Sequence, residues 1–309
     1  MPASKKSRRW PETPAPLAGP VTDNHTHLPL SVEEIPEVQG ERPSLEVQLA
    51  RAREVGVHRI ITVGCELNDL EPACTLADAH EGVFAAVAIH PNEAPLHAGP
   101  LRHAADDAPD GLTPVLRPHH EVSLDDALAA VARAARHPKV VAIGESGLDF
   151  FRGGEGAKAA QIAAFRAHIA LAKELDLPLQ IHDRDAHAEV IQTLLADGAP
   201  QRTVFHCFSG DAQMAQVLAE HGWYASIAGP VTYHANDYAR QALDALPREL
   251  VLVETDAPYL APHPLRGRPN ASYVMPVTVR AIAQRWGAEE GEACRALEEN
   301  TQRVYNFPV

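Results

Sequence analysis

The chain has 309 residues, of which 45% are hydrophobic, and 27 basic against 41 acidic side chains give it a formal net charge of −14. This length and apolar content suit one large domain with a sizeable core. The excess of acid argues against a protein that coats nucleic acid through its phosphates, and no run of about 18 apolar residues predicts a transmembrane helix.

The first residues, 1–20, are basic and then rich in proline. The pair Arg8-Arg9 is not followed by the apolar segment of an export signal, so we expect residues 1–20 to be a flexible tail. The remaining residues, 21–309, are expected to form a single domain.

Eight stretches along the chain predict β-strands, over 21–27, 59–64, 83–90, 140–146, 178–182, 203–207, 223–229 and 250–256. Amphipathic helices are expected over 45–56, 124–137, 159–176 and 212–222, and a last helix within 287–307. Alternating strands and helices are typical of parallel βα units, and eight units predict a closed (β/α)8 TIM barrel. A doubly wound open sheet is the alternative, but no GxGxxG turn favours it.

The segment 91–122 interrupts this alternation, because it is long for a connection and rich in proline and polar residues. Loops of this length are typically functional lids or insertions. We therefore expect an inserted loop. Its four histidines are expected to be solvated side chains: His97, His103, His119 and His120.

Residues that bind metals occur at the ends of several predicted strands. The stretch VTDNHTHL places Asp23, His25 and His27 at alternate positions, so their side chains share one face of the first strand. Later strands end with or near Glu145, His182, His206 and Asp256. Strand ends of a barrel meet at the edge that carries the active site. Six ligand-type residues are therefore expected at one rim.

Imidazoles and carboxylates in this combination suit divalent ions such as magnesium, manganese or zinc. Two ions can share the six residues if one carboxylate bridges them, and Glu145, on the fourth strand, is the expected bridge. One ion is expected to bind His25, His27, Glu145 and Asp256, and the other Glu145, His182 and His206. Such a pair can activate water for phosphoryl transfer. Glu145 and Asp256 are the expected catalytic residues, with Asp256 also a candidate general base.

Two further acids share these faces. Asp23 faces the same way as His25 and is a candidate to orient a ligating imidazole. Glu254 shares the face of Asp256. It is equally compatible with tuning the metal site and with a purely structural role as a hydrogen-bond acceptor.

The motifs DNHTH, AIHPNEAP, IGESGLDFFR, IHDRDA, HCFSG and ETDAPYLAPHPLRGRPN follow one another in the chain. In this order they resemble the motif set of the TatD family of metal-dependent DNases, from about Asp23 to the end. The resemblance implies a two-metal barrel hydrolase acting on DNA, often as a 3′→5′ exonuclease on single strands. Ser146 stands where the family commonly has a bulkier or apolar residue, and RGRPNASY lacks the proline that often follows the asparagine.

Substrate contacts are expected from the loops after the strands. The candidates are His90, Arg152, Arg184, Ser209 and Arg266. Arginines beside metal ions suit phosphate groups, because they donate paired, charged hydrogen bonds. Phe208 and Tyr259 are candidates to stack on a base, although packing is the commoner role for such aromatic residues.

The sequence thus predicts a hydrolase that cleaves DNA phosphodiester bonds at single-stranded ends. The alternative is a related barrel hydrolase acting on an amide, ester, lactone or phosphotriester. A non-catalytic metal-binding protein is a third possibility, against which the complete ligand set argues. Four cysteines without a CxxC pair favour a cytoplasmic location. Neither a membrane nor a stable protein partner is expected.

Overall fold

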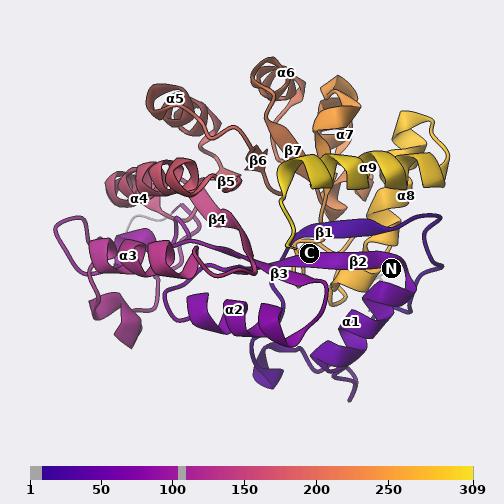
Figure 1. Cartoon of the computed structure of the whole chain (residues 1–309), viewed down its shortest axis with the longest axis horizontal. Coiled ribbons are helices and arrows are strands. Elements are labelled where there is room, and N and C mark those ends of the chain that lie inside the picture. Colours follow the sequence, from indigo (N-terminus) through magenta and orange to yellow (C-terminus); the bar gives the residue numbers. More distant parts are fainter. Residues whose placement is uncertain (1–8, 104–108, 309) are drawn as a thin grey trace, which may run out of the picture.

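The computed structural model describes residues 9–103 and 109–308, and within these ranges eight parallel strands form one sheet in chain order. The strands are β1 (Val21–Thr26), β2 (Val57–Gly64), β3 (Val83–Val87), β4 (Val140–Asp149), β5 (Leu179–Arg184), β6 (Thr203–Phe205), β7 (Tyr224–Ile227) and β8 (Val251–Val253). Helices surround the strands on the outside (Figure 1). The predicted (β/α)8 barrel is confirmed.

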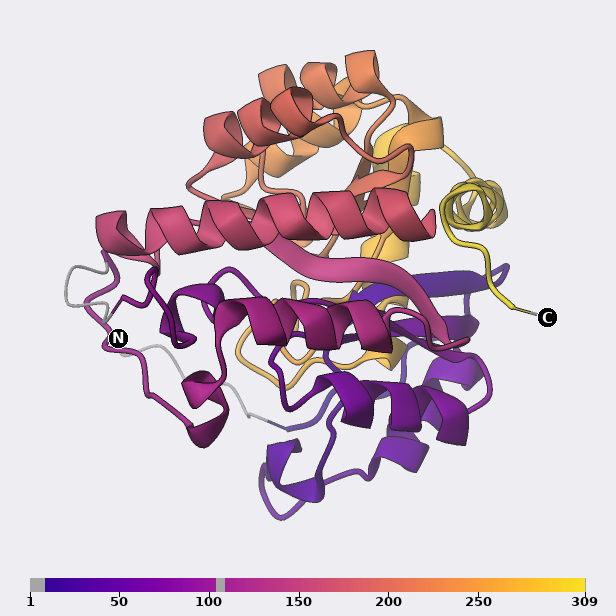
Figure 2. The same cartoon turned by 60° about the vertical axis from the view of Figure 1, so that its left-hand side comes forward.

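The α-helices of the described ranges are α1 (Leu45–Glu54), α2 (Leu70–Ala79), α3 (Leu124–Ala134), α4 (Gly154–Leu175), α5 (His187–Asp197), α6 (Ala212–His221), α7 (Asp237–Ala245), α8 (Pro276–Trp286) and α9 (Glu290–Val304). Side chains cap several of them, because Ser44, Ser123 and Asp211 accept hydrogen bonds from the first turns of α1, α3 and α6. Figure 2 shows the long α4 lying across the molecule beside α3. None of the helices described combines the length and apolarity needed to cross a bilayer.

The barrel closes between β1 and the segment that follows β8. The amide of His27 donates to the carbonyl of Ala257 at 2.7 Å, and the amide of Asp256 donates to the carbonyl of His25 at 3.0 Å. The Asn24 side chain adds a bond to the carbonyl of Val253 at 2.8 Å. Because these bonds lie at the strand ends, closure itself brings the first and last ligand-type residues together.

Apolar side chains fill the inside of the barrel. One buried cluster takes alternate residues of β2 and β3, namely Ile61, Val63, Phe84 and Ala86. The opposite faces of the same strands pack with the helices in a larger cluster. Tyr305, which follows α9, also belongs to the inner cluster, and Phe307 packs against it. The end of the chain therefore contributes to the core of the barrel.

The contact between β4 and β5 depends on a glycine. Gly147 has a φ of +139°, and a Cβ atom there would meet the carbonyl of His182. Gly147 is also the register partner of His182. A residue without a side chain is needed at this point, because the two strands approach closely and the backbone is in a region that favours glycine. This approach positions Glu145 beside His182.

Residues 9–20, within the segment expected to be a tail, contain no helix or strand. Trp10 is nevertheless only 6% exposed, and its ring nitrogen donates to the carbonyl of Pro36 at 3.2 Å. The Tyr273 hydroxyl donates to the carbonyl of Pro11 at 3.0 Å. These residues therefore pack along the barrel beside α1 and the segment before α8.

The expectation of solvated histidines in the 91–122 insertion is wrong for three of the four. His97, His119 and His120 are buried, with 1%, 6% and 1% exposure. They pack on one another, with ring centroids 4.1–6.2 Å apart. Composition suggested a solvated loop, but contacts with distant parts of the chain bury the ends of the insertion.

Candidate metal centre

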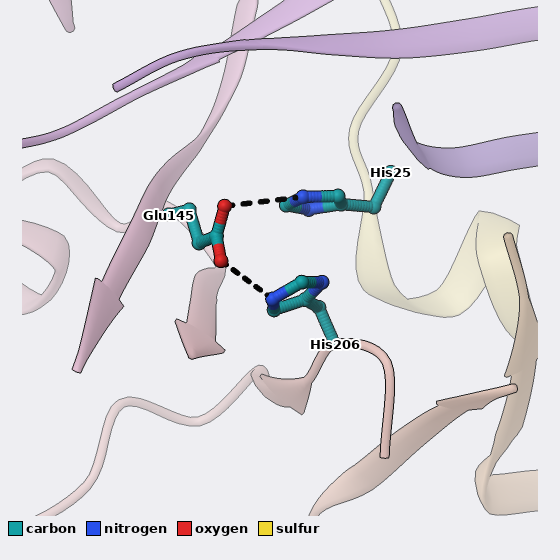
Figure 3. Close-up of side chains that lie close together, drawn as sticks. All are labelled: His25, Glu145 and His206. Carbon is teal, nitrogen blue, oxygen red and sulfur yellow. Dashed lines mark ion pairs between the residues drawn. The ribbon is translucent and has the colours of Figure 1, made fainter. Parts of the chain in front are cut away.

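Glu145, on β4, lies at the centre of the candidate site. Its Oε2 atom lies 3.5 Å from Nε2 of His25, and its Oε1 atom lies 2.7 Å from Nε2 of His206. Figure 3 shows the two imidazoles facing the two oxygens of this one carboxylate. Residues from β1, β4 and the end of β6 therefore converge, as the strand-end argument requires.

The Oε2 side of Glu145 gathers the N-terminal histidines. His27 Nε2 lies 3.8 Å from Oε2 and 3.5 Å from Oδ1 of Asp256. His25, His27 and Asp256 each offer a ligand atom, and these atoms lie within 4.8 Å of one another. The set expected for the first ion is thus brought together on one side of the carboxylate.

The Oε1 side of Glu145 gathers the remaining histidines. His182 Nδ1 lies 2.5 Å from Oε1, beside His206. His90 Nε2 lies 3.3 Å from the same oxygen. His90 was expected to contact substrate, but its position beside His182 and Glu145 makes it a further candidate ligand. Its place at the end of the third predicted strand was the signal in the sequence that pointed to the rim.

Outer partners orient three of these imidazoles. His25 Nδ1 donates to Oε1 of Gln180 at 3.0 Å, and His182 Nε2 pairs with Oδ2 of Asp149 at 3.1 Å. His206 Nδ1 pairs with Glu254 Oε1 at 3.3 Å. Such partners fix the ring orientation of metal ligands. Sequence patterns indicated Glu254 but neither Gln180 nor Asp149.

Asp23 was a candidate to orient a ligating imidazole, but its carboxylate is hydrogen-bonded to Thr255. Its carboxylate accepts from the amide and the hydroxyl of Thr255, at 2.8 and 2.6 Å. Burial raises the pKa of Asp23 to about 7, despite the hydrogen bonds from Thr255 that lower it. Asp23 thus joins β1 to the segment after β8 and holds the chain next to Asp256.

The charges of the site favour an ionised carboxylate at its centre. Burial acts to raise the pKa of Glu145, but the imidazoles of His206 and His90 outweigh it and hold that pKa well below its usual range. Burial acts to lower the pKa of His182, but its hydrogen bonds to Asp149 and Glu145 raise it to about 9. Glu145 is therefore anionic, and a divalent cation bound here would replace the proton of His182 that faces it.

The donor set fits divalent metal ions. Within the described part of the chain, the buried Nε2 atom of His25 has no hydrogen-bond partner. Its Nδ1 atom already donates to Gln180, so Nε2 presents a lone pair toward Glu145. A buried acceptor of this kind needs a cation or a donor to compensate for lost hydration. Imidazole nitrogen and carboxylate oxygen are ligands that zinc, manganese and related ions accept.

A cysteine also borders the centre. Cys65 Sγ lies 3.8 Å from Oε2 of Glu145. Burial raises the pKa of the Cys65 thiol well above its ordinary value, and the nearby charge of Glu145 raises it further. Cys65 therefore remains a protonated thiol beside the carboxylate.

The centre opens into a cleft of about 1060 Å³. Four of the predicted substrate residues line it, namely His90, Arg152, Arg184 and Ser209. Arg266 is not among the described lining residues and instead lies over the ring of Tyr233, 4.2 Å from its centroid.

The two aromatic candidates differ in their surroundings. Tyr259 lines the cleft with 60% exposure, and its ring packs edge-on against His27. Phe208 is buried against Phe205. Tyr259 is thus the one of the two that presents its ring to a bound molecule.

Comparison with known proteins places the chain among similar sequences and folds. A family model described as TatD-related DNase matches residues 22–306. An uncharacterized metal-dependent hydrolase named TatD from Mycobacterium tuberculosis is 36% identical over 93% of this chain and 98% of that protein. A protein named 3′-5′ ssDNA/RNA exonuclease TatD, from Klebsiella pneumoniae, is 33% identical over 84% of this chain and 91% of its own length. The crystal structure of YjjV, a TatD homolog from Escherichia coli, matches with a TM-score of 0.77 and 27% identity over 93% of this chain and 98% of that one.

Proposed function

Because the chain belongs to the family of TatD-related DNases, and is therefore a metal-dependent hydrolase, we propose that it cleaves phosphodiester bonds at the 3′ ends of single-stranded DNA with two divalent ions. The observation that carries the proposal is the division of ligand-type side chains between the two oxygens of Glu145. The Klebsiella relative, which its name describes as a single-strand exonuclease, supports the choice of substrate.

The proposed ligands follow from that division. On the Oε2 side, His25, His27 and Asp256 would hold one ion together with Glu145. On the Oε1 side, His182 and His206 would hold the other with the same carboxylate, and His90 is close enough to join them. When bound, the ions supply Lewis acidity that activates water and neutralises charge on the phosphate.

The side chains of the cleft have their own parts in the reaction. Asp256 would accept the proton of the attacking water at its carboxylate, as a general base. Arg152 and Arg184 line the cleft and would bind phosphate oxygens through charged hydrogen bonds. Arg184 already has its guanidinium over Phe151, 4.1 Å from the ring centroid, which holds its plane in place. Ser209 and the exposed ring of Tyr259 would contact the nucleotide itself.

The proposed location is the cytoplasm. All four cysteines of the chain are free, and three of them, Cys65, Cys74 and Cys294, are buried. Thiols that are not paired suit a reducing compartment. This feature supports the proposal and is compatible with a DNA substrate in the same compartment.

The test is a metal-replacement assay on purified protein. After chelation, magnesium, manganese or zinc is restored, and the protein is offered single-stranded DNA, duplex DNA, RNA and p-nitrophenyl esters. The expected result is metal-dependent release of nucleotides from free 3′ ends of single strands, with a 3′-blocked strand as control. Hydrolysis of the carboxyl esters alone would contradict the proposal and support the related barrel hydrolase.

A further inference from the structure

The two ends of the 91–122 insertion are fixed to the barrel by a polar cluster that is distinct from the metal centre. Glu93 Oε2 accepts from Nε2 of His120 at 2.7 Å and lies 3.5 Å from Nε2 of His119. Asn68, from the loop after β2, donates to Nδ1 of His119 at 3.0 Å. We call these four residues the insertion anchor. Its histidines are almost fully buried.

The insertion anchor has the residue types of a metal site, since ligand atoms of Glu93, His119 and His120 lie within 4.8 Å of one another. Its hydrogen bonds, however, indicate a structural role. The backbone amide of Arg117 donates to Nδ1 of His120 at 2.9 Å, so the proton of the neutral ring sits on Nε2 and is directed at Glu93. A nitrogen that carries a proton is not available to a metal ion. The anchor is therefore a hydrogen-bonded support.

The insertion anchor supports Arg117, because His120 accepts the hydrogen bond of the Arg117 backbone amide. The side chain of Arg117 is 55% exposed and lines the active-site cleft. Its guanidinium forms an ion pair with Glu66, on the loop after β2. The following Pro118 begins a short turn that contains both buried histidines. An exposed cationic side chain thus lines the cleft, on a backbone whose amide is hydrogen-bonded to a buried histidine.

Arg117 completes a series of arginines along one side of the cleft. Arg117 follows β3, Arg152 follows β4 and Arg184 is the last residue of β5, so three successive strands of the barrel supply arginines that line the cleft. The segment after β1 contributes apolar side chains to the lining, among them Leu28, Leu30 and Ile35, together with the acid Glu34. Grooves for single strands commonly combine a cationic path for the backbone with apolar or aromatic surface for the bases.

We propose that Arg117 binds a backbone phosphate of the substrate strand at a distance from the phosphate that is cleaved. The proposal rests on the proposed nuclease function. Glu145 contacts His90, and the backbone carbonyl of His90 accepts a hydrogen bond from the amide of Glu93. Glu93 in turn pairs with His120, which lies beside Arg117. Arg117 is thus separated from the metal centre by a layer of side chains, and it acts in binding longer strands rather than in the chemical step.

Glu66 acts on this contact as an internal competitor. Its carboxylate occupies the guanidinium that a phosphate would take. Removing its charge with Glu66→Gln should therefore strengthen binding of a long strand, but only while Arg117 is present. In an Arg117→Ala background the same substitution should have no such effect, because the two changes act on one interaction.

The experiment compares Arg117→Ala with Arg102→Ala on a single strand of about a dozen nucleotides and on a dinucleotide. Arg102 is a matched control, since it belongs to the same insertion and pairs with Glu121 at 3.0 Å outside the cleft lining. For the long strand, Arg117→Ala should raise KM about tenfold, as for a lost charged hydrogen bond, with kcat unchanged. For the dinucleotide neither parameter should change, and Arg102→Ala should match the wild type on both.

Salt dependence separates phosphate binding from a structural role. Loss of one phosphate contact should reduce the slope of log KM for the long strand against log salt by about 0.7. Equal slopes for wild type and Arg117→Ala, or equal losses on both substrates, would overturn the proposal while the nuclease function stood. A wild-type protein without activity on any strand would overturn both together. Variants whose melting temperatures lie within a few degrees of the wild-type value are folded and can be compared.

Discussion

At the scale of single residues, the account depends on the carboxylate of Glu145. Each of its oxygens faces a different group of histidines, and the residue is only 3% exposed. A side chain that contacts both groups cannot be replaced without affecting both halves of the site. A neutral amide of the same shape would keep the packing but lose the charge that would offset the two proposed cations.

Glu145→Gln should therefore lower metal content and reduce hydrolysis by roughly two orders of magnitude or more, since loss of an outer partner alone typically costs 10- to 100-fold. Metal content measured by mass spectrometry and single-strand hydrolysis give the two readouts. Glu37→Gln, which changes an exposed acid paired with Arg42, serves as the control. Full activity in Glu145→Gln would show that this residue is no bridge.

The support of His25 by Gln180 leads to a second prediction. Gln180 Oε1 accepts from His25, and its amide nitrogen donates to the carbonyl of Asn24 and to the hydroxyl of Tyr305. Gln180→Leu leaves the ring of His25 without this partner, so metal affinity measured by titration calorimetry should fall about 10- to 100-fold. Tyr305→Phe keeps the bond to His25 and should retain near-wild-type affinity. Unchanged affinity in Gln180→Leu would contradict the orienting role.

Sequence patterns could predict the members of the site but not all of their contacts. His25, His27, Glu145, His182, His206 and Asp256 were recognisable because strand ends meet at one rim of a barrel. Gln180, inside a strand, and Asp149, beyond the predicted end of the fourth strand, carry no comparable signal, because each is informative only once its neighbour is known. The burial of His119 and His120 depends likewise on Asn68 and Glu93, distant in sequence.

At the scale of elements, α4 is joined to the strands by a buried histidine. His168 Nε2 accepts from the amide of Ile89 at 3.1 Å, and its Nδ1 lies 2.7 Å from the carbonyl of Ala164 and 2.9 Å from the Ser146 hydroxyl. Ile89 and Ser146, which His168 contacts outside the helix, are the sequence neighbours of His90 and Glu145 in the site. A neutral ring is needed, because a proton on Nε2 would face the amide proton of Ile89.

This contact gives a pH dependence of stability. Burial lowers the pKa of His168 from 6.5 to about 4, so the unfolded chain binds the proton more readily than the folded one. The stabilisation is fully present above pH 6.5 and is lost as the pH falls toward 4, by about 3 kcal/mol. Denaturant titration of the chelated proteins should show that, over this pH range, the free energy of unfolding falls less for His168→Gln than for the wild type. Parallel curves for the two proteins would refute the assignment.

The strands could be predicted better than the helices. All eight strands occur near their expected positions, including β1, whose polar sequence VTDNHT is buried at every residue. Helices α2, α5, α7 and α8 had not been singled out. Helix α7 has only nine residues, which is short for identification from sequence, and α8 begins at Pro276 with β-branched residues of low helix propensity in its first turn. Packing against the barrel stabilises them.

At the scale of the whole molecule, binding of the proposed ions would be coupled to the stability of the fold. The centre joins residues from β1, β4, β5 and the segments after β6 and β8, so an ion bound there connects distant parts of the chain. Binding to the folded state alone stabilises it by about 2.7 kcal/mol at an ion concentration 100 times the dissociation constant. The net charge of −14 adds to the demand for cations.

Removal of metal should therefore lower the melting temperature by several degrees, and restoring the ion should reverse the change. Differential scanning calorimetry before and after chelation measures the effect. Glu145→Gln should show a much smaller response to chelation than the wild-type protein. An equal response in both would place the stabilising ion elsewhere in the molecule.

The central claim, that one carboxylate divides two ions between its oxygens, is tested most directly by anomalous diffraction from crystals soaked in manganese. The account predicts two peaks at ligand distance from Glu145, one beside His25, His27 and Asp256 and the other beside His182 and His206. A single peak, or none within reach of Glu145, would contradict it.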